Sequence, residues 1–293
     1  MKVSGFTFVR NAVKYDYPVV EAITSILPLC DEFVVCLGKS EDDTEKLVQS
    51  IASPKIKIVH SVWDDSLRKG GQVLAIETNK AFDAIAPDSD WAFYIQADEV
   101  VHEKYLPALK QAMAQHLNNQ RVECLVLKYL HFYGNYKYVG DSRNWYRREI
   151  RIIRNNKSIR SYKDAQGFRR FNNQQFNKLN GKLIDAYIYH YGWVKNPYYQ
   201  QSKIQDFNKL WHSDEYVAKV IPQVDLFDYS KINSLRLFDK THPQVMQTRI
   251  AAMSWDFEFD ERKRHFSTKE KILNWIEKRT GKRLFEFKNY RLL

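Results

Sequence analysis

Apolar and polar positions alternate along the first 120 residues in the manner of an α/β sheet protein. Apolar runs of strand length occur at residues 3–9, 33–37, 56–63 and 91–95. Apolar residues recur at helical spacing within residues 18–27, 47–51, 73–85 and 106–117. Strands that are joined in sequence by helices favour a largely parallel sheet with helices on both faces.

The pattern changes after these first strands and helices. Residues 122–138 are rich in β-branched and aromatic residues around Gly134-Asn135, which predicts a hairpin. Residues 150–153 and 183–191 are further strand candidates, and helical signals dominate from Pro197 onward.

The C-terminal part contains one clear helix signal. Ser267-Thr268-Lys269-Glu270 matches a capping box, and Gly281 is placed to end the helix that follows. We expect an α/β domain over residues 1–195 that carries the functional site. We expect a helical, basic and aromatic-rich appendage over residues 196–293.

Composition favours a folded protein of a reducing compartment. At 293 residues, with 44% hydrophobic and 14% aromatic residues, the chain is long enough to bury a sizeable core. Cys30, Cys36 and Cys124 match neither a disulfide framework nor a zinc spacing, so we expect buried thiols. The first residues lack the apolar core of a signal peptide, and no apolar run reaches the ~18 residues of a membrane span. We therefore expect a cytoplasmic protein.

The net charge of +11 is concentrated in two segments. Residues 143–170 hold ten basic and two acidic residues, and residues 261–293 hold eleven and four. Such segments favour an anionic partner (phosphate, anionic lipid or nucleic acid), although a charged run is often only a solvated surface. For the C-terminal segment two interpretations stay open: a patch that docks on lipid headgroups, or a helix pinned to the α/β domain by its apolar side chains.

The segment Trp91–Val101 carries the sharpest chemical signal. Its apolar and aromatic run ends at Ile95 and is followed at once by Gln96-Ala97-Asp98-Glu99. Open α/β sheets bind ligands at the carboxyl ends of their strands, so Asp98 is placed where a carboxylate can hold a divalent cation and, through it, a diphosphate. The alternative is a strand that ends in a solvated turn.

Five short motifs follow one another in the first 195 residues. They are Arg10-Asn11, Ser40-Glu41-Asp42-Asp43-Thr44, Gln96-Ala97-Asp98-Glu99, Asp164-Ala165-Gln166-Gly167-Phe168-Arg169 and His190-Tyr191-Gly192-Trp193. In this order they resemble the motifs of family 2 glycosyltransferases of the GT-A fold. The resemblance implies a Rossmann-like, mostly parallel central sheet flanked by helices. It also implies sugar transfer from a nucleotide-diphosphate donor to a glycan or lipid-linked acceptor, usually with inversion and with Mg²⁺ or Mn²⁺.

The sequence departs from that family at two positions. Gln96 stands where members commonly have the first Asp of Asp-x-Asp, and Cys36-Leu37 stands where many have an Asp that grips the nucleoside. Because Gln96 brings no charge, direct cation binding depends on fewer carboxylates, and metal dependence stays open.

Two acids are candidates for the base that an inverting transfer needs at the acceptor hydroxyl. Asp164 stands in an arginine-rich stretch that should keep it ionised, and its alternative role is that of a salt-bridge partner. Glu149 is the second candidate, although it fits an ordinary strand charge. Asp98 and His190 are the metal candidates and would stabilise the leaving diphosphate, whereas a lone histidine is as often structural.

Further residues are expected at the donor from their places at strand ends and turns. They are Arg10, Asn11, Ser40, Asp42, Trp63, Lys69, Gly70, Gly71, Asn79, Gln96 and Asp98. Asp42 can instead cap the helix that follows it, and the two glycines can belong to a plain surface turn.

Two other functional classes stay open. A nucleotidyltransferase that makes nucleotide-sugars would share the sheet and its acidic strand end, but residues 9–13 lack the glycine of a triphosphate-binding loop. A non-catalytic polyanion binder is suggested by aromatic residues interleaved with the basic ones. No recognised nucleic-acid motif is present, so we expect no nucleic acid partner. Contact with the inner face of a membrane would be peripheral, through the C-terminal basic region.

Overall fold

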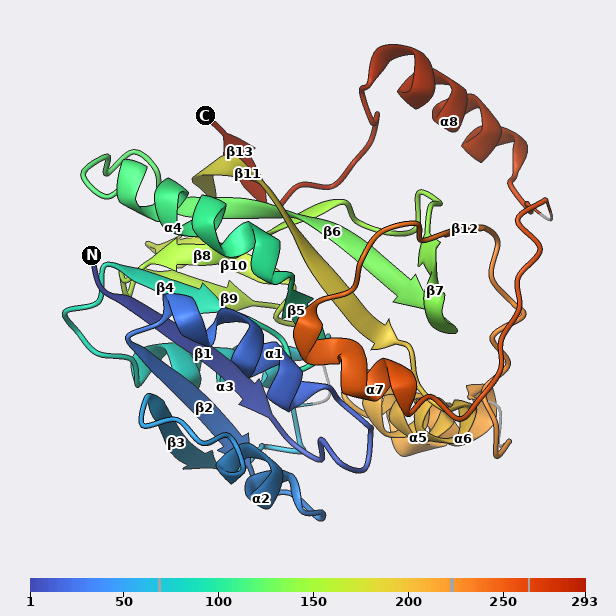
Figure 1. The fold of residues 1–293 in the computed structure, drawn as a ribbon, viewed down its shortest axis with the longest axis horizontal. Coiled ribbons are helices and arrows are strands. Elements are labelled where there is room, and N and C mark those ends of the chain that lie inside the picture. Colours follow the sequence, from blue (N-terminus) through green and yellow to red (C-terminus); the bar gives the residue numbers. More distant parts are fainter. Residues whose placement is uncertain (68–69, 222–223, 263) are drawn as a thin grey trace.

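The computed structural model describes residues 1–67, 70–221, 224–262 and 264–293 (Figure 1). Its strands are β1 (Val3–Val9), β2 (Glu32–Gly38), β3 (Ile56–Ser61), β4 (Trp91–Tyr94), β5 (Glu99–Val101), β6 (Cys124–Tyr133), β7 (Asn135–Gly140), β8 (Arg148–Arg154), β9 (Ile159–Tyr162), β10 (Gly167–Asn172), β11 (Gln175–Trp193), β12 (Leu235–Leu237) and β13 (Tyr290–Leu292). Its α-helices are α1 (Val19–Ile26), α2 (Thr44–Gln49), α3 (Gln72–Asp83), α4 (Leu106–Gln115), α5 (Pro197–Asn208), α6 (Asp214–Val220), α7 (Gln247–Ala251) and α8 (Thr268–Thr280). Short 3-10 helices are η1 (Leu27–Leu29), η2 (Glu103–Tyr105) and η3 (Gln244–Met246).

The strands form one curved sheet with a parallel half and a mixed half. In the order β3-β2-β1-β4 all neighbouring strands run parallel. β8 runs antiparallel to both β4 and β6, and β11 pairs in parallel with β6 and antiparallel with β10. The predicted α/β class, with a central sheet flanked by helices, is confirmed (Figure 1). The sheet is mixed rather than mostly parallel, because the strands from β5 onward add antiparallel pairs.

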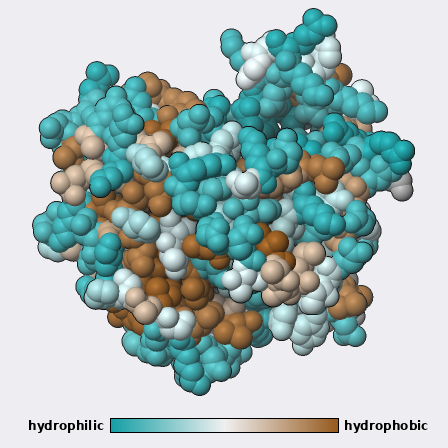
Figure 2. Space-filling model, viewed as in Figure 1, coloured by the Kyte–Doolittle hydropathy of each residue, from teal (hydrophilic) through white to brown (hydrophobic). Residues whose placement is uncertain are grey.

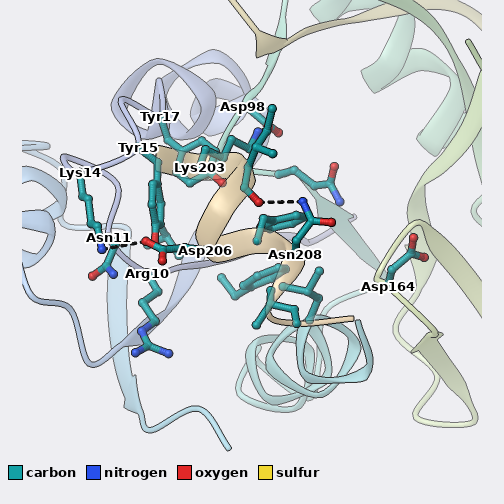
Figure 3. A pocket seen from close by; sticks show the side chains of 18 of the residues that line it. Arg10, Asn11, Lys14, Tyr15, Tyr17, Asp98, Asp164, Lys203, Asp206 and Asn208 are labelled. Atoms are coloured by element: carbon teal, nitrogen blue, oxygen red, sulfur yellow. Dashed lines mark hydrogen bonds and ion pairs between the residues drawn. The ribbon is translucent and has the colours of Figure 1, made fainter. Parts of the chain in front are cut away.

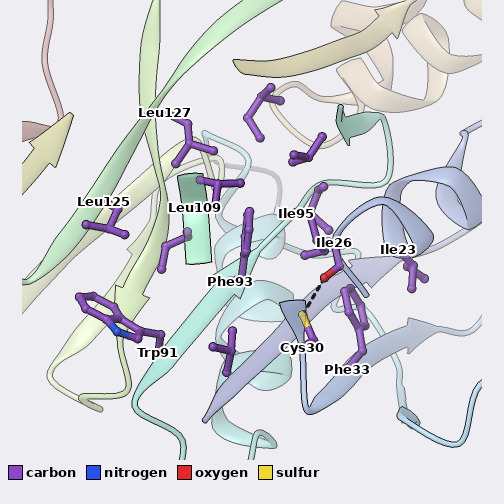
Figure 4. Packing of buried hydrophobic residues seen from close by; sticks show 14 of the residues in the cluster. Ile23, Ile26, Cys30, Phe33, Trp91, Phe93, Ile95, Leu109, Leu125 and Leu127 are labelled. Carbon is purple, nitrogen blue, oxygen red and sulfur yellow. Dashed lines mark hydrogen bonds between the residues drawn. The ribbon is translucent and has the colours of Figure 1, made fainter. Parts of the chain in front are cut away.

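Alternation along the parallel strands explains why both faces of the sheet are covered. In β2, Phe33 and Val35 belong to the apolar cluster under α1 and α4, whereas Val34 and Cys36 belong to the cluster under α3. Phe93 of β4 extends the first cluster (Figure 4). Because both faces are covered, these strands are continuous apolar runs in the sequence, and this pattern allowed their prediction.

The buried thiols follow from the same packing. Cys30, Cys36 and Cys124 are free and buried, as predicted. Cys30 donates to the backbone carbonyl of Ile26 at 3.3 Å (Figure 4), and burial raises its pKa to about 12. A thiol with so high a pKa is a packing residue rather than a nucleophile.

Local signals at turns and helix ends are also found in the structure. Ser267 and Glu270 form the reciprocal capping box of α8, and Gly281 ends this helix with a φ of 67°. The hairpin of β6 and β7 turns at Gly134, where φ is 75°.

The C-terminal part holds α5, α6, α7 and α8 and also returns to the sheet. β12 pairs with β7, and β13 pairs in parallel with β11. These two strands cover edges whose backbone groups would otherwise lack partners. α8 has no buried residue and stands away from the sheet in Figure 1.

Among the described helices, none combines the length and apolar character that crossing a bilayer requires.

A fully buried ion pair joins β5 to β8. Nε and Nη2 of Arg151 donate to the carboxylate of Glu99 at 2.8 and 2.7 Å, and the hydroxyl of Tyr129 donates to the same carboxylate at 2.7 Å. Both charged side chains have no exposed surface. Because burial removes their hydration, this pair is stable only through such a complete set of hydrogen bonds.

Removing one partner of this pair should destabilise the fold strongly. We expect Glu99→Gln to lower the free energy of unfolding by about 3–5 kcal/mol, because the guanidinium of Arg151 would stay buried without a counter-charge. Urea unfolding measures the loss. The partly exposed pair of Arg160 and Asp83 is the control, and Asp83→Asn should cost less than about 1 kcal/mol. Similar small losses in both variants would contradict the prediction.

Candidate active site

A cavity of about 690 Å³ opens at the carboxyl ends of β1 and β4. Helix α5 forms one side, and the turn between β9 and β10 contributes to another (Figure 3). Its charged lining residues include Arg10, Lys14, Glu41, Asp65, Asp98, Asp164, Lys203, Asp206 and Lys209. The cavity lies where open α/β sheets bind ligands, and its size is ordinary for a small-molecule site.

Asp98 faces this cavity, whereas Glu99 beside it faces the core. Oδ2 of Asp98 accepts a hydrogen bond from Nζ of Lys203 at 3.3 Å, and Oδ1 lies 3.7 Å from Nε2 of His190. Burial alone would raise the pKa of Asp98. The positive charge of Lys203, with smaller contributions from its other basic neighbours, outweighs burial and holds this pKa well below its usual range.

His190 takes its tautomer from a chain of hydrogen bonds. Its Nδ1 lies 3.1 Å from Nδ1 of His131, and Nε2 of His131 lies 2.8 Å from the backbone carbonyl of Tyr146. A carbonyl only accepts, so His131 carries its proton on Nε2 and His190 donates from Nδ1. Nε2 of His190 is then an acceptor on the side of Asp98. Burial lowers the pKa of His190, which agrees with a neutral ring.

Two lysines that the sequence did not single out lie near Asp98. Lys203 comes from α5, and its Nζ lies 4.9 Å from the ring centre of Tyr17. Lys195 is fully buried just before α5, and its Nζ donates to the backbone carbonyl of Asp16 at 3.0 Å. Burial, together with the charge of Lys203, lowers the pKa of Lys195 to about 7. Lys203 therefore supplies the positive charge that faces Asp98 in the cavity, whereas Lys195 is only partly protonated near neutral pH.

Several residues predicted at the donor line the cavity: Arg10, Asn11, Trp63 and Gln96. Arg10 donates to Asp65 at 3.0 Å, and its guanidinium lies 5.4 Å from the ring centre of Trp63. Asn11 follows β1 in a left-handed conformation with a φ of 55°. This conformation turns the chain at the strand end.

Three other predicted donor residues contact the protein outside this cavity. Asp42 accepts the backbone N–H of Lys14 at 2.7 Å, and Ser40 lies in the same turn. Both line a smaller hollow beside β3. Asn79 binds the backbone of Ser161 in both directions, at 2.9 and 3.1 Å, and so joins α3 to β9. Hydrogen bonds within the protein account for all three side chains.

The predicted basic glycine turn lies at the start of α3. Gly70 and Gly71 have φ values of 60° and 67°, and a β-carbon on Gly71 would come within 2.7 Å of Trp211. The N–H of Gly71 donates to the carbonyl of Leu210 at 3.3 Å, so this turn packs against the end of α5. Lys69 lies outside the described residues.

Asp164 lines the cavity from the turn between β9 and β10, apart from Asp98 in Figure 3. The arginine environment expected around it is absent among the described residues. The arginines concerned have other partners: Arg160 with Asp83, Arg169 with Tyr162 and Asn289, and Arg170 with Glu123. These contacts with Asp83, Asn289 and Glu123 hold the three guanidinium groups.

Glu149, the second candidate base, lies in the core. Its carboxylate accepts the N–H of Ile150 at 2.8 Å and Nδ2 of Asn289 at 2.5 Å. Burial raises its pKa to about 7. The structure thus places this carboxyl against the C-terminal segment, and it does not contribute to the described cavity lining.

The described residues do not fit a divalent cation at Asp98. They contain no group of three His, Cys, Asp or Glu side chains placed to hold a metal. Gln96 brings an amide, and its Nε2 donates to the backbone carbonyl of Ala165 at 3.4 Å. The ammonium of Lys203 contacts Asp98 at 3.3 Å and would repel a cation there.

The side of the cavity formed by α5 was missed because this helix was assigned to an appendage. Gln200, Lys203, Ile204 and Phe207 recur at helical spacing, and all four line the cavity. Asp206, on the same helix, pairs with Lys14 at 2.9 Å across the cavity rim (Figure 3). The occurrence of Lys203 on the same helix face as Ile204 and Phe207 was the available signal.

No protein-family model matches this sequence, and no curated protein matches it significantly. Similar solved structures include a glucosyl-3-phosphoglycerate synthase from Mycobacterium tuberculosis, crystallised with Mn²⁺, UDP and phosphoglyceric acid. It is 19% identical over 44% of this chain and 43% of its own, with a TM-score of 0.31. TarS from S. aureus is 16% identical over 70% of this chain and 38% of its own, with a TM-score of 0.41. The matches span less than half of the length of either protein, and we take no substrate from them.

Proposed function

We propose that the protein is a glycosyltransferase that takes a sugar from a nucleotide-diphosphate donor bound in this cavity. The observation that carries the proposal is the position of Asp98, which follows the carboxyl end of a parallel strand, faces the cavity and contacts the ammonium of Lys203. A diphosphate needs such charge when it leaves with the bonding electrons. Aromatic residues from α5 and β11 give the same cavity faces on which a sugar or base can stack.

The reaction we propose is an inverting displacement. The acceptor oxygen forms a bond to the anomeric carbon as the bond from that carbon to the diphosphate breaks, and the electron pair goes to the diphosphate oxygen. Asp164 takes the proton of the acceptor hydroxyl. It lines the cavity from a different element than Asp98, so base and leaving-group site can lie on different sides of the sugar.

The acceptor that we propose is a glycan or a lipid-linked sugar. Trp193 lines the cavity and offers an aromatic face on which an acceptor sugar can stack. A role in polysaccharide biosynthesis at the cytoplasmic side would follow. The polyanion-binding alternative is weakened because Arg143 and Arg147 of the central basic segment are paired with Glu277 and Glu286.

The first experiment on this function is a hydrolysis screen of nucleotide-sugars with the wild-type protein and Asp98→Ala. We expect slow hydrolysis of one donor by the wild type and a loss of at least about 100-fold in the variant, because the leaving-group site is disrupted. Circular dichroism checks the fold. Asp185→Ala, an exposed acid of β11, is the control and should keep full turnover. Near-normal turnover by Asp98→Ala would contradict the assignment.

A second prediction concerns the base. Asp164→Asn should lose about 100-fold or more in transfer rate but bind the donor nucleotide as the wild type does, since only the proton acceptor is removed. Glu149→Gln, which keeps the shape of a buried carboxyl, should transfer at close to the wild-type rate. Transfer rates, together with nucleotide binding by calorimetry, distinguish the two variants. A slow Glu149→Gln and a wild-type rate in Asp164→Asn would assign the base to Glu149.

Peripheral contact with an anionic membrane is part of this proposal. α8 and the segment after it expose apolar side chains, with Trp275 at 61%, Phe285 at 88% and Phe287 at 64% exposure, among the basic residues of 261–293. Glu277 ties the helix to Arg143, so ion pairs rather than apolar packing attach it. The visible face of α8 in Figure 2 is mainly hydrophilic. This combination suits lipid headgroups.

Vesicle sedimentation tests this contact. We expect binding to anionic vesicles that weakens as salt rises, and none to neutral vesicles, because the attraction is electrostatic. Phe285→Ser should reduce the bound fraction, while Leu226→Ser, which changes an exposed apolar residue elsewhere, should not. Protein that stays in the supernatant with anionic vesicles at low salt would contradict the membrane contact.

A further inference from the structure

The charged partner of Asp98 is a lysine that arrives from a different part of the chain. Nζ of Lys203 lies 3.3 Å from Oδ2 of Asp98 and 3.1 Å from the carbonyl oxygen of Gly192. The contact joins β4's carboxyl end, β11's carboxyl end and α5 at one point. Lys203 also lines the cavity, so its ammonium is accessible to a ligand there (Figure 3).

The side chains around this point suit an anion better than a cation. An ammonium has three hydrogens, and the described residues provide two hydrogen-bond acceptors for Lys203, so one hydrogen is available to a ligand. A second lysine, Lys195, lies buried behind the first, and its charge also acts on Asp98. Gln96 adds no negative charge. At this point Asp98 thus faces the ammonium of Lys203 and the partial charge of Lys195, whose pKa burial lowers to about 7.

We propose that the ammonium of Lys203, positioned by Asp98, binds the diphosphate of the donor in the place that a divalent cation would otherwise take. The inference rests on the proposed function and assigns its leaving-group site. Lys203 supplies a fixed positive charge to the phosphate oxygens and stabilises the charge that develops when the glycosyl bond breaks. Asp98 is then a positioning residue that holds the ammonium at the strand end, rather than a metal ligand.

Calorimetric titration of the full chain with UDP, GDP, ADP and CDP, one at a time, tests the proposal. The protein is treated with EDTA, and each titration is repeated with added Mn²⁺. We expect one nucleoside diphosphate to bind in EDTA with an affinity that Mn²⁺ changes little. Binding only in the presence of Mn²⁺ overturns this inference and leaves the proposed function standing. Absence of binding in both conditions overturns the proposed function as well.

Variants assign the effect to Lys203. Lys203→Met should weaken binding in EDTA by about 10- to 100-fold, the usual weight of a charge-assisted contact, while Lys203→Arg keeps the charge and should restore most of the affinity. Lys110→Met, an exposed lysine of α4, is the control and should bind as the wild type does. Asp98→Asn leaves the ammonium and should still bind in EDTA.

Wild-type affinity in Lys203→Met would overturn the inference. A second outcome would also overturn it: the wild type binds the nucleotide only with Mn²⁺, and Asp98→Asn does not bind even with Mn²⁺. Asp98 would then act as a metal ligand. The titration of the wild-type protein in EDTA is decisive even where a variant does not fold.

Discussion

The buried ion pair of Glu99 and Arg151 fixes the geometry on which the candidate active site depends. Arg151 binds both carboxylate oxygens of Glu99, and its Nη1 also donates to the backbone carbonyl of Gln166 at 3.1 Å. Glu99 follows Asp98 directly, and Gln166 is two residues from Asp164. One guanidinium therefore holds both the loop that carries Asp98 and the loop that carries Asp164. Because the pair is inaccessible to water, it has few alternative arrangements, and the two loops are fixed relative to each other.

Two adjacent carboxylates have opposite roles because the chain turns between them. Glu99 begins β5, whose register with β11 directs its side chain into the core, and Asp98 in the preceding turn is directed into the cavity. Each carboxylate has a basic partner, Arg151 for Glu99 and Lys203 for Asp98. The guanidinium suits the fully buried position because its planar fork binds both oxygens. The single ammonium suits the cavity because it leaves a hydrogen for a ligand.

Much of the parallel half of the sheet could be predicted from the sequence. Its strands are buried on both faces, so they are continuous apolar runs, and the segments between them have the apolar spacing of helices. The place of Asp98 at a strand end followed from the break after Ile95. Its partner could not be predicted in the same way. Lys203 is 105 residues away along the chain, and only the folded path of β11 and α5 brings it to the strand end. The same limit applies to Asn79 and Glu149, whose polar side chains looked available but bind Ser161 and Asn289 in the fold.

The position of α5 shows that both predicted regions, residues 1–195 and 196–293, contribute side chains to the cavity. The sequence suggested a boundary near residue 195, yet Lys195 is fully buried and α5 begins at Pro197 with its cavity-facing stripe. Asp98 and Asp164 come from before this boundary, and Lys203, the ion-pair partner of Asp98, comes from after it. An uncompensated carboxylate at this mostly buried position would be costly, so the C-terminal region is needed for the charge state of the strand end as well as for the shape of the cavity. The pKa of Asp98 therefore depends on α5. Without Lys203 of that helix, burial would raise this pKa and favour the uncharged carboxyl.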